Sequence, residues 1–168
     1  MSILELLKGG KHPGRPESAG LIATIENALK EKEWEFERDE GHSERLRIGL
    51  AGHNTDLRGV FLARQEKDQV FFYVHLPTKT PEGRRREAAE FITRANYGLS
   101  IGNFEMDMED GEIRFKVSMD VEGGTLSPPM VINMMMTGFT MVDRYFPGFM
   151  SVMYGNAIPA VAVREIES

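Results

Sequence analysis

Apolar residues recur along the chain with a period that predicts three long helices. In residues 18–33, 80–96 and 130–146 they lie three and four residues apart, which places them on one face of a helix. A shorter helix is expected at residues 159–167. Between the helices apolar and polar residues mostly alternate, as they do in half-buried strands. The expected strands are residues 34–37, 46–50, 57–65, 69–76, 104–108 and 113–121.

The order of these elements predicts the fold class. One helix is followed by three or four strands, a second helix, two strands and a third helix. Short connections between successive strands favour antiparallel pairing. We therefore expect an α+β domain with an antiparallel sheet and helices packed on one of its faces.

The last two strands are expected to form a hairpin closed by Asp110 and Gly111. Asp-Gly is a frequent two-residue turn, and alternating sequences flank it here. If these two residues form the loop, apolar side chains meet on one face and opposite charges on the other. The predicted pairs are Met108 with Ile113, Met106 with Phe115, Phe104 with Val117, Asp107 with Arg114, and Glu105 with Lys116.

The methionine-rich helix has more apolar surface than one packing contact needs. Its polar side chains, Asn133, Thr137, Thr140 and Arg144, occupy one narrow wedge, whereas a helix on a sheet needs an apolar stripe only about 100° wide. We expect the helix to end at Pro147 and to be covered on two sides, by its own sheet and by a second subunit or a client protein. Methionine repacks easily and recurs at adaptable binding surfaces, although it also serves as ordinary core filler.

Two of the strands also have apolar residues on both faces. In residues 57–65 and 69–76 aromatic and aliphatic side chains follow one another, which is typical of strands buried on both sides. A second covering layer is expected here too. The expected partner-binding residues are Phe61, Phe71, Tyr73, Met130, Met134, Met135, Gly138, Met141, Val142 and Tyr145.

The domain organisation follows from where regular patterns stop. Residues 1–16 combine a short apolar segment with a Gly- and Pro-rich stretch, and we expect a flexible arm. Residues 17–155 are expected to form the α+β domain. Residues 156–168 are expected to form a helical tail.

Composition limits the function classes. The 168 residues include no cysteine, which excludes disulfides and thiolate metal sites, and the net charge of −6 argues against a nucleic-acid partner. The start of the chain lacks the pattern of a signal peptide, and no apolar run reaches the ~20 residues that span a bilayer. The expectation is a cytoplasmic protein with no membrane partner.

None of the candidate catalytic or metal-binding motifs in the sequence has the residues or the order of elements that its chemistry requires. Residues 98–102 match the G-x-S-x-G nucleophile pattern, but that elbow needs a strand before Ser100 and a helix after it, the reverse of the expected order. A calcium loop with Gly111 at its sixth position would need oxygen ligands where Met106 and Met108 stand. No two histidines have helical ligand spacing. We expect no cofactor, no metal and no enzymatic activity.

The stretch F-I-T-R-A-N-Y-G-L-S-I-G-N-F-E-M-D-M-E-D-G-E-I-R-F-K-V-S-M-D-V-E, residues 91–122, resembles the YbjN domain family. In that family a helix ending in Arg-x-Asn leads into a strand, an acidic turn with glycine, and a long alternating strand. The resemblance covers about residues 18–154. It implies a fold like that of type III secretion chaperones, which are small α+β subunits, often dimeric, that bind other proteins. It implies no catalytic residues.

These observations favour a non-enzymatic, chaperone-like or regulatory module that acts as a homodimer and binds an unidentified protein client. The alternative is a small-molecule or lipid sensor, in which the surplus apolar surface lines an internal pocket. A hydrolase is a distant third hypothesis that depends on Ser100 alone.

Overall fold

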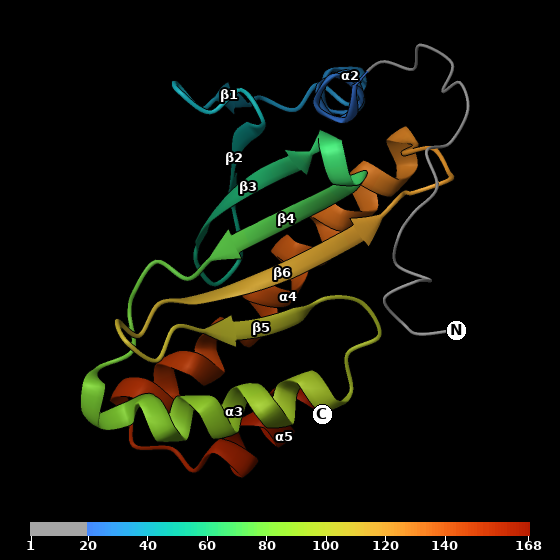
Figure 1. Cartoon of the computed structure of the whole chain (residues 1–168). Coiled ribbons are helices and arrows are strands. Elements are labelled where there is room, and N and C mark those ends of the chain that lie inside the picture. The colour runs from blue at the N-terminus through green and yellow to red at the C-terminus, as the bar shows by residue number, and fades with distance from the viewer. Residues whose placement is uncertain (1–19) are drawn as a thin grey trace, which may run out of the picture.

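Six antiparallel strands form a single twisted sheet in the computed structural model of this chain, which describes residues 20–168 (Figure 1). The strand order is β1-β2-β3-β4-β6-β5, so β4 and β6 are neighbours although α3 and β5 separate them in the sequence. The strands are β1 (Glu37–Arg38), β2 (Arg45–Ala51), β3 (Asp56–Arg64), β4 (Gln69–His75), β5 (Asn103–Met106) and β6 (Ile113–Asp120).

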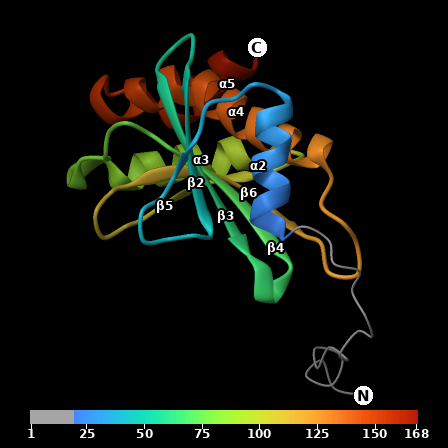
Figure 2. The same ribbon diagram turned by 90° about the horizontal axis from the view of Figure 1, so that it is seen from above.

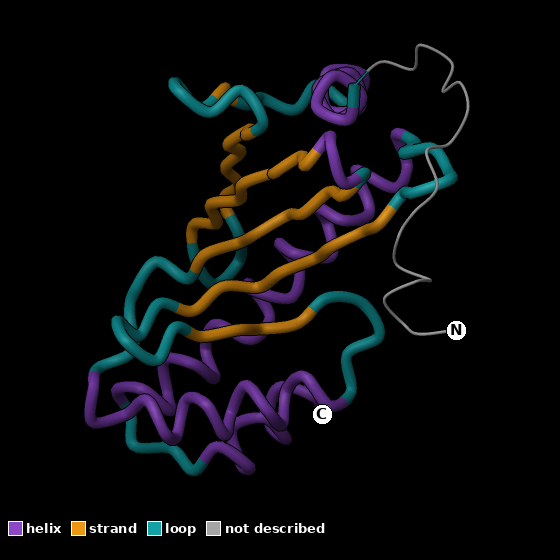
Figure 3. Tube along the Cα trace, viewed as in Figure 1, coloured by secondary structure: helices purple, strands orange, loops and turns teal. Residues whose placement is uncertain are grey.

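All the described helices lie on one face of this sheet or at its ends. The long helix α4 crosses behind β3, β4 and β6 (Figure 1), α2 packs against it near β3, and α3 and α5 pack together at the β5 end. Figure 2 shows from above that the opposite face carries no described helix. The helices are α2 (Leu21–Glu31), α3 (Arg85–Tyr97), α4 (Pro128–Tyr154) and α5 (Pro159–Glu167), with short 3-10 turns at Gln65–Lys67 and Glu82–Arg84 (Figure 3). The predicted α+β class and one-sided helical layer are confirmed.

The core lies between α4 and the sheet, and glycines set its thickness. Phe72 of β4 contacts Phe61 and Phe139, with ring centroids 4.4 and 5.3 Å apart. A Cβ on Gly138 of α4 would lie 2.9 Å from the Phe72 ring, and one on Gly59 of β3 would lie 2.3 Å from it. Both distances are shorter than van der Waals contact, so α4 reaches this close to the sheet only because both positions are glycine.

Helix α4 does not end at Pro147, contrary to expectation. It continues without interruption to Tyr154. A proline inside a helix removes one N–H and leaves the carbonyl four residues earlier without its donor. That carbonyl belongs to Asp143, and the side-chain amide of Asn54 donates to it at 2.9 Å. The donor that a helix would normally supply comes from the loop between β2 and β3.

The predicted register of the β5–β6 hairpin is wrong by two residues. Phe104 pairs with Phe115, Glu105 with Arg114 and Met106 with Ile113, so the connection runs from residue 107 to residue 112. The loop is longer because Asp107 closes it with two hydrogen bonds. Its N–H donates to the Glu112 carbonyl at 2.9 Å, and its carbonyl accepts from the N–H of Gly111 at 2.8 Å. A shift of two preserves which face each side chain occupies, so the predicted apolar and charged faces are correct.

The first predicted strand is also shorter than expected, because only Glu37 and Arg38 pair with β2. Arg38 forms an ion pair of 2.6 Å with Glu26, a nearly buried carboxylate of α2, and this contact holds β1 against the helix. Trp34 and Phe36 pack against the core without joining the sheet.

The last helix is part of the core. Ala162 and Val163 of α5 are buried, and the hydroxyl of Tyr145 donates to the carboxylate of Glu167 at 2.8 Å. Residues 159–167 are helical as predicted. The predicted arm at residues 1–16 lies outside the described residues.

Candidate functional site

The two edges of the sheet differ in how their backbone groups are satisfied. At the β5 edge, the side chain of Asn96 acts in place of a neighbouring strand. Its Oδ1 accepts from the N–H of Phe104 at 2.8 Å, and its Nδ2 donates to the carbonyl of the same residue at 2.9 Å. Asn96 is the last residue of the Arg-x-Asn motif, so this motif satisfies the edge of β5 at Phe104, and helix α3 packs beside the same strand.

The β2 edge is open over half of its length. Beyond the two residues of β1, only the N–H of Asp39 donates to β2, to the Arg45 carbonyl at 3.3 Å. In an antiparallel ladder, alternate residues point their N–H and C=O groups to the same side. Gly49 and Ala51 therefore point theirs outward, as Arg45 does. No partner for these groups is found among residues 20–168.

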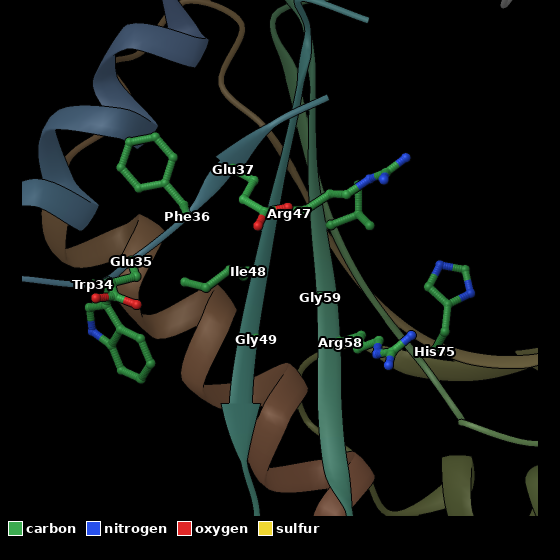
Figure 4. A pocket seen from close by; sticks show the side chains of 11 residues that line it. Trp34, Glu35, Phe36, Glu37, Arg47, Ile48, Gly49, Arg58, Gly59 and His75 are labelled. Atoms are coloured by element: carbon green, nitrogen blue, oxygen red, sulfur yellow. The ribbon is translucent and has the colours of Figure 1, made fainter. Parts of the chain in front are cut away.

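A groove of about 1040 Å³ runs beside this open edge (Figure 4). Trp34 and Phe36 lie on one side of β2, and Arg47, Arg58 and His75 lie on the other. Gly49 lies between them on β2, and a Cβ there would make only an ordinary contact, 3.8 Å from the Leu57 carbonyl oxygen. The groove is open to solvent and combines apolar with charged walls, so it differs from the enclosed apolar pocket expected of a lipid sensor.

The charged side chains at the groove are unequally paired. Arg47 forms an ion pair of 3.1 Å with Asp39, and Nδ1 of His75 lies 3.5 Å from a carboxylate oxygen of Glu112. The side chain of Arg58 is exposed and forms no ion pair or hydrogen bond within the described part of the chain. Its guanidinium is therefore available to a ligand with a carboxylate or phosphate.

The face of the sheet away from the helices, which we call the open face, has an apolar centre. Val60 pairs with Tyr73 and Leu62 with Phe71, and these four half-buried side chains form a block across β3 and β4. The rings of Phe71 and Tyr73 are parallel, with centroids 5.9 Å apart. No described element packs on this block (Figure 1).

Basic side chains surround the apolar block. The guanidinium of Arg64 lies 4.9 Å from the Phe71 ring centroid, and that of Arg114 lies 4.4 Å from the Tyr73 centroid. The strand registers place the following charged residues on the open face: Arg45, Arg47, Arg58, Arg64, Arg114 and Lys116, against Glu37, Asp56, Glu105 and Asp120. Asp39, which pairs with Arg47, and Glu112, which lies beside His75, bring the anions on this face to six, so cations and anions are equal in number there.

One of those anions, Glu105, already pairs with two neighbouring cations. Glu105 accepts hydrogen bonds from Arg114 at 2.6 Å and from Lys116 at 2.8 Å. Partial burial acts to raise the pKa of Glu105, but these two cations outweigh it and hold that pKa below its usual range. Glu105 therefore stays ionised and fixes both cations at the β6 side of the apolar block.

The structure divides the predicted partner-binding residues between the interior and the surface. Six are buried within the subunit, where α2, α3, α5 and the sheet together cover the methionine-rich helix. The inference that this helix needs a second subunit to cover it is therefore wrong. The six are Phe61, Met134, Met135, Gly138, Val142 and Tyr145; Met130 and Met141 are half-buried on α4, and Phe71 and Tyr73 lie on the open face.

Sequence reasoning missed the basic residues of the open face and the free backbone of β2. The alternation of Arg45 and Arg47 with apolar residues was visible, but neither the strand order nor the shortness of β1 can be read from it.

The rejected elbow residue Ser100 is exposed in the connection between α3 and β5, with no hydrogen-bond partner among residues 20–168. In the same residues, no group of three or more His, Asp or Glu side chains could hold a metal ion, and no helix is long and apolar enough to cross a membrane.

Residues 21–150 match the profile of the YbjN family, described as a "putative bacterial sensory transduction regulator". The chain belongs to the YbjN family. Its fold is similar to the crystal structure of YbjN from E. coli, with a TM-score of 0.55 and 12% identity over 82% of this chain and 95% of that one. It is also similar to a chain of the ExsC–ExsE complex, with a TM-score of 0.50 and 14% identity over 76% and 94% of the two chains.

A third similar structure is a chain of the HopA1–SchA chaperone–effector complex, with a TM-score of 0.47 and 14% identity over 72% of this chain and 88% of that one. No curated protein sequence matches the chain. At such identities the structural matches establish the shared fold only.

Proposed function

We propose that this YbjN-family protein is a non-enzymatic, chaperone-like module that captures an extended segment of another protein along the open edge of β2. The observation that carries the proposal is the difference between the two edges. Asn96 satisfies the outward groups of Phe104 on β5 and α3 packs beside that strand, whereas Gly49 and Ala51 of β2 have outward-facing groups without partners in residues 20–168. An extended peptide that adds a strand to such an edge gains main-chain hydrogen bonds, and pockets beside the edge select its side chains.

The groove supplies such pockets on both sides of the edge. A strand added beside Gly49 alternates its side chains between the two faces of the sheet. Those on the helix side meet Trp34, Phe36 and Ile48, and those on the other side meet Arg47 and Arg58. One similar structure, with a TM-score of 0.50, is a chain of the ExsC–ExsE complex, which supports a protein ligand for this fold.

The test uses one position and two substitutions. Gly49→Pro removes the outward N–H of β2 without touching the ladder to β3, because the ladder bonds of β2 are made by its even-numbered residues. Gly49→Ala keeps the N–H, and its Cβ has room. We expect a client purified with the wild-type protein to bind the alanine variant with unchanged affinity and the proline variant at least about tenfold more weakly.

A second measurement locates the contact. Client binding should slow amide hydrogen exchange at Gly49 and Ala51 if their groups become paired. Equal affinity of the proline and alanine variants, with no slowing at these two amides, would refute edge capture.

We also propose that the protein acts as a homodimer, with an interface other than the buried part of α4. The candidate surface is an apolar patch where α4 meets α5, formed by Tyr154, Ile158 and Val161, which are 50%, 65% and 41% exposed. Exposed apolar patches of this kind occur at protein interfaces. Light scattering of the wild type and of the Ile158→Glu/Val161→Glu variant tests this: a dimer that becomes a folded monomer supports the patch, and a monomeric wild type excludes the dimer.

A further inference from the structure

The open stretch of β2 sets clear requirements for the segment that can pair with it. On the helix side the segment meets Trp34 and Phe36, so it needs apolar side chains there. On the open face it meets Gly49, which has no side chain, and beyond it Arg58, whose guanidinium has no ion pair or hydrogen bond among residues 20–168. Because side chains of a strand alternate between the two faces, the edge fits an apolar–acidic–apolar sequence.

Such a sequence occurs in this chain, within residues 1–19, which lie outside the part that the structure describes. Residues 2–8 read S-I-L-E-L-L-K. With Glu5 opposite Gly49, an added strand places Leu4 and Leu6 on the helix side and the Glu5 carboxylate on the open face. We propose that residues 3–6 occupy the open stretch of β2 in their own subunit and must leave it before a client segment binds. This regulation rests on the proposed capture of a client at the β2 edge.

The position of Arg58 explains why the acidic residue belongs opposite Gly49. Arg58 lies in register with Gly49, so no side chain stands between its guanidinium and a residue of the added strand at that position. Among nearby carboxylates, Glu35 lies on the other side of β2, Glu37 belongs to β1, and Asp56 lies further along the ladder. None of the three forms an ion pair with Arg58. A glutamate opposite Gly49 would supply the missing partner.

The described chain begins close enough for this contact. The backbone N–H of Leu21 donates to the side chain of Gln65 at 2.6 Å, which places the start of α2 at the end of β3. From Gln65 to Gly49 a path along β3 and β2 covers about seven residues at ~3.3 Å each and one step of ~4.8 Å between strands, less than about 30 Å. Residues 7–19 can span up to about 40 Å.

An antiparallel orientation suits this connection. Residues 3–6 then run from Ala51 toward Ile48, and residue 7 reaches the place where Glu37 of β1 pairs with Arg47. The added strand would end where β1 begins, and the residues that follow it lead toward the start of α2.

Tethering favours the segment of the same subunit over that of a second copy. A segment joined to its site by about a dozen residues has an effective concentration on the order of 1 mM. A contact of four residues that would be weak between separate molecules can therefore persist within one subunit. A longer client segment, with more main-chain hydrogen bonds, can displace it.

Amide hydrogen exchange of the full-length protein without a client provides the first test. Leu4→Ser/Leu6→Ser changes the side chains expected on the helix side, and Ile3→Ser/Leu7→Ser is the matched control with the same change in composition. We expect the first variant to speed exchange at Gly49 and Ala51 by about tenfold, and the control by less than about threefold.

A charge exchange tests the pairing with Arg58. Glu5→Arg should speed exchange at Gly49, because it brings a second cation to Arg58, and Arg58→Glu alone should do the same. The double variant Glu5→Arg/Arg58→Glu should return exchange to the wild-type rate, since the two charges have only changed places. A general loss of stability in either single variant would not be repaired by the second substitution.

A synthetic peptide with the sequence of residues 2–8 serves as the probe added in solution. If the site is free for only about a tenth of the time, the peptide should bind the wild type about tenfold more weakly than Leu4→Ser/Leu6→Ser. The factor in Kd should equal the factor in exchange at Gly49, because both report the same fraction of free site.

Three results would overturn the proposal: exchange at Gly49 and Ala51 that the Leu4→Ser/Leu6→Ser variant leaves unchanged, a charge exchange that restores nothing, or protection that rises with protein concentration. The last would assign the edge to the segment of a second copy. Failure of client capture is a separate result. Equal client binding by Gly49→Pro and Gly49→Ala would refute capture, whereas none of the measurements on residues 3–6 requires a client.

Discussion

The side-chain amide of Asn54 donates a hydrogen bond of 2.9 Å to the backbone carbonyl of Asp143, 89 residues away. The carboxylate of Asp143 in turn accepts hydrogen bonds from the backbone N–H of Asn54 at 2.8 Å and from that of Thr55 at 3.3 Å. A Cβ on Gly52 would lie 2.3 Å from Oδ1 of Asp143, so this approach requires glycine. The loop between β2 and β3 is thereby fixed to the middle of α4.

The first prediction concerns the hydrogen bond that Pro147 makes necessary. Asn54→Ala should lower the free energy of unfolding by about 1 kcal/mol, because the Asp143 carbonyl loses its donor. In a Pro147→Ala background residue 147 again has an N–H, so the same Asn54 substitution should cost less. Denaturant unfolding of the two single variants and the double variant measures the difference. An equal cost in both backgrounds would show that the amide does not replace the missing helical donor.

The second prediction compares neighbouring methionines of α4. Met135 is completely buried and Met136 is 40% exposed. Met135→Glu places a carboxylate in the core without a partner and should lower the free energy of unfolding by about 3 kcal/mol or more. Met136→Glu should change it by less than about 0.5 kcal/mol. Thermal unfolding of both variants checks this, and a stable, folded Met135→Glu monomer would instead support α4 as an intersubunit contact.

The third prediction tests the closure of the β5 edge. Asn96→Ala removes both hydrogen bonds to Phe104 and leaves that strand edge unsatisfied. We expect a loss of about 1–3 kcal/mol of stability and faster aggregation, since unpaired edges template further pairing. Asn103→Ala is the control, because Asn103 makes only a 3.3 Å contact with the same carbonyl. Similar aggregation rates of the two variants would argue against edge closure by Asn96.

The fourth prediction concerns pH. Burial, together with the hydrogen bond and charge of Glu167, raises the pKa of Tyr145 to about 12. The unfolded state then loses this proton at a lower pH than the folded state. The contribution of Tyr145 to stability is therefore complete below pH ~10 and is lost as pH rises toward 12.

Tyrosinate absorbance should show one of the four tyrosines ionising late, and Tyr145→Phe should remove that late step. Tyr97 serves as the control because its side chain is 96% exposed. If Tyr145→Phe leaves the titration unchanged and Tyr97→Phe removes the late step, the assignment to Tyr145 is wrong.

The periodic parts of the sequence predicted the fold well. Leu21–Glu31, Arg85–Tyr97 and Pro159–Glu167 are helical where apolar residues recur at helical spacing; alternation located β2 and β6, and continuous apolar runs located β3 and β4. Local patterns sufficed for these elements because each packs one continuous apolar face against the core.

The errors came from contacts between distant segments. Pro147 breaks a helix by local rules, but Asn54 supplies the missing donor from another part of the chain. The turn at Asp110 and Gly111 fits a two-residue loop, but Asp107 closes a longer one with its backbone.

The same reason explains why the candidate site was largely missed. The apolar excess of α4 was counted correctly from Met134 and Met135, yet what covers it is α2, α3 and α5 of the same subunit. Residues such as Arg58 and Arg64 become neighbours of an apolar block only once the strand order is known.

The asymmetry between the sheet edges limits how copies of this protein can associate through their strands. An open-ended polymer joined strand to strand needs two free, complementary sheet edges on every subunit, because each added subunit must offer a new free edge to the next. In residues 20–168 the Asn96 amide and helix α3 lie along the β5 edge, whereas the stretch of β2 around Gly49 has outward groups without partners. Once a strand has been added at that stretch of β2, the edge is occupied and the same subunit offers no new one. Strand addition there therefore stops after one strand.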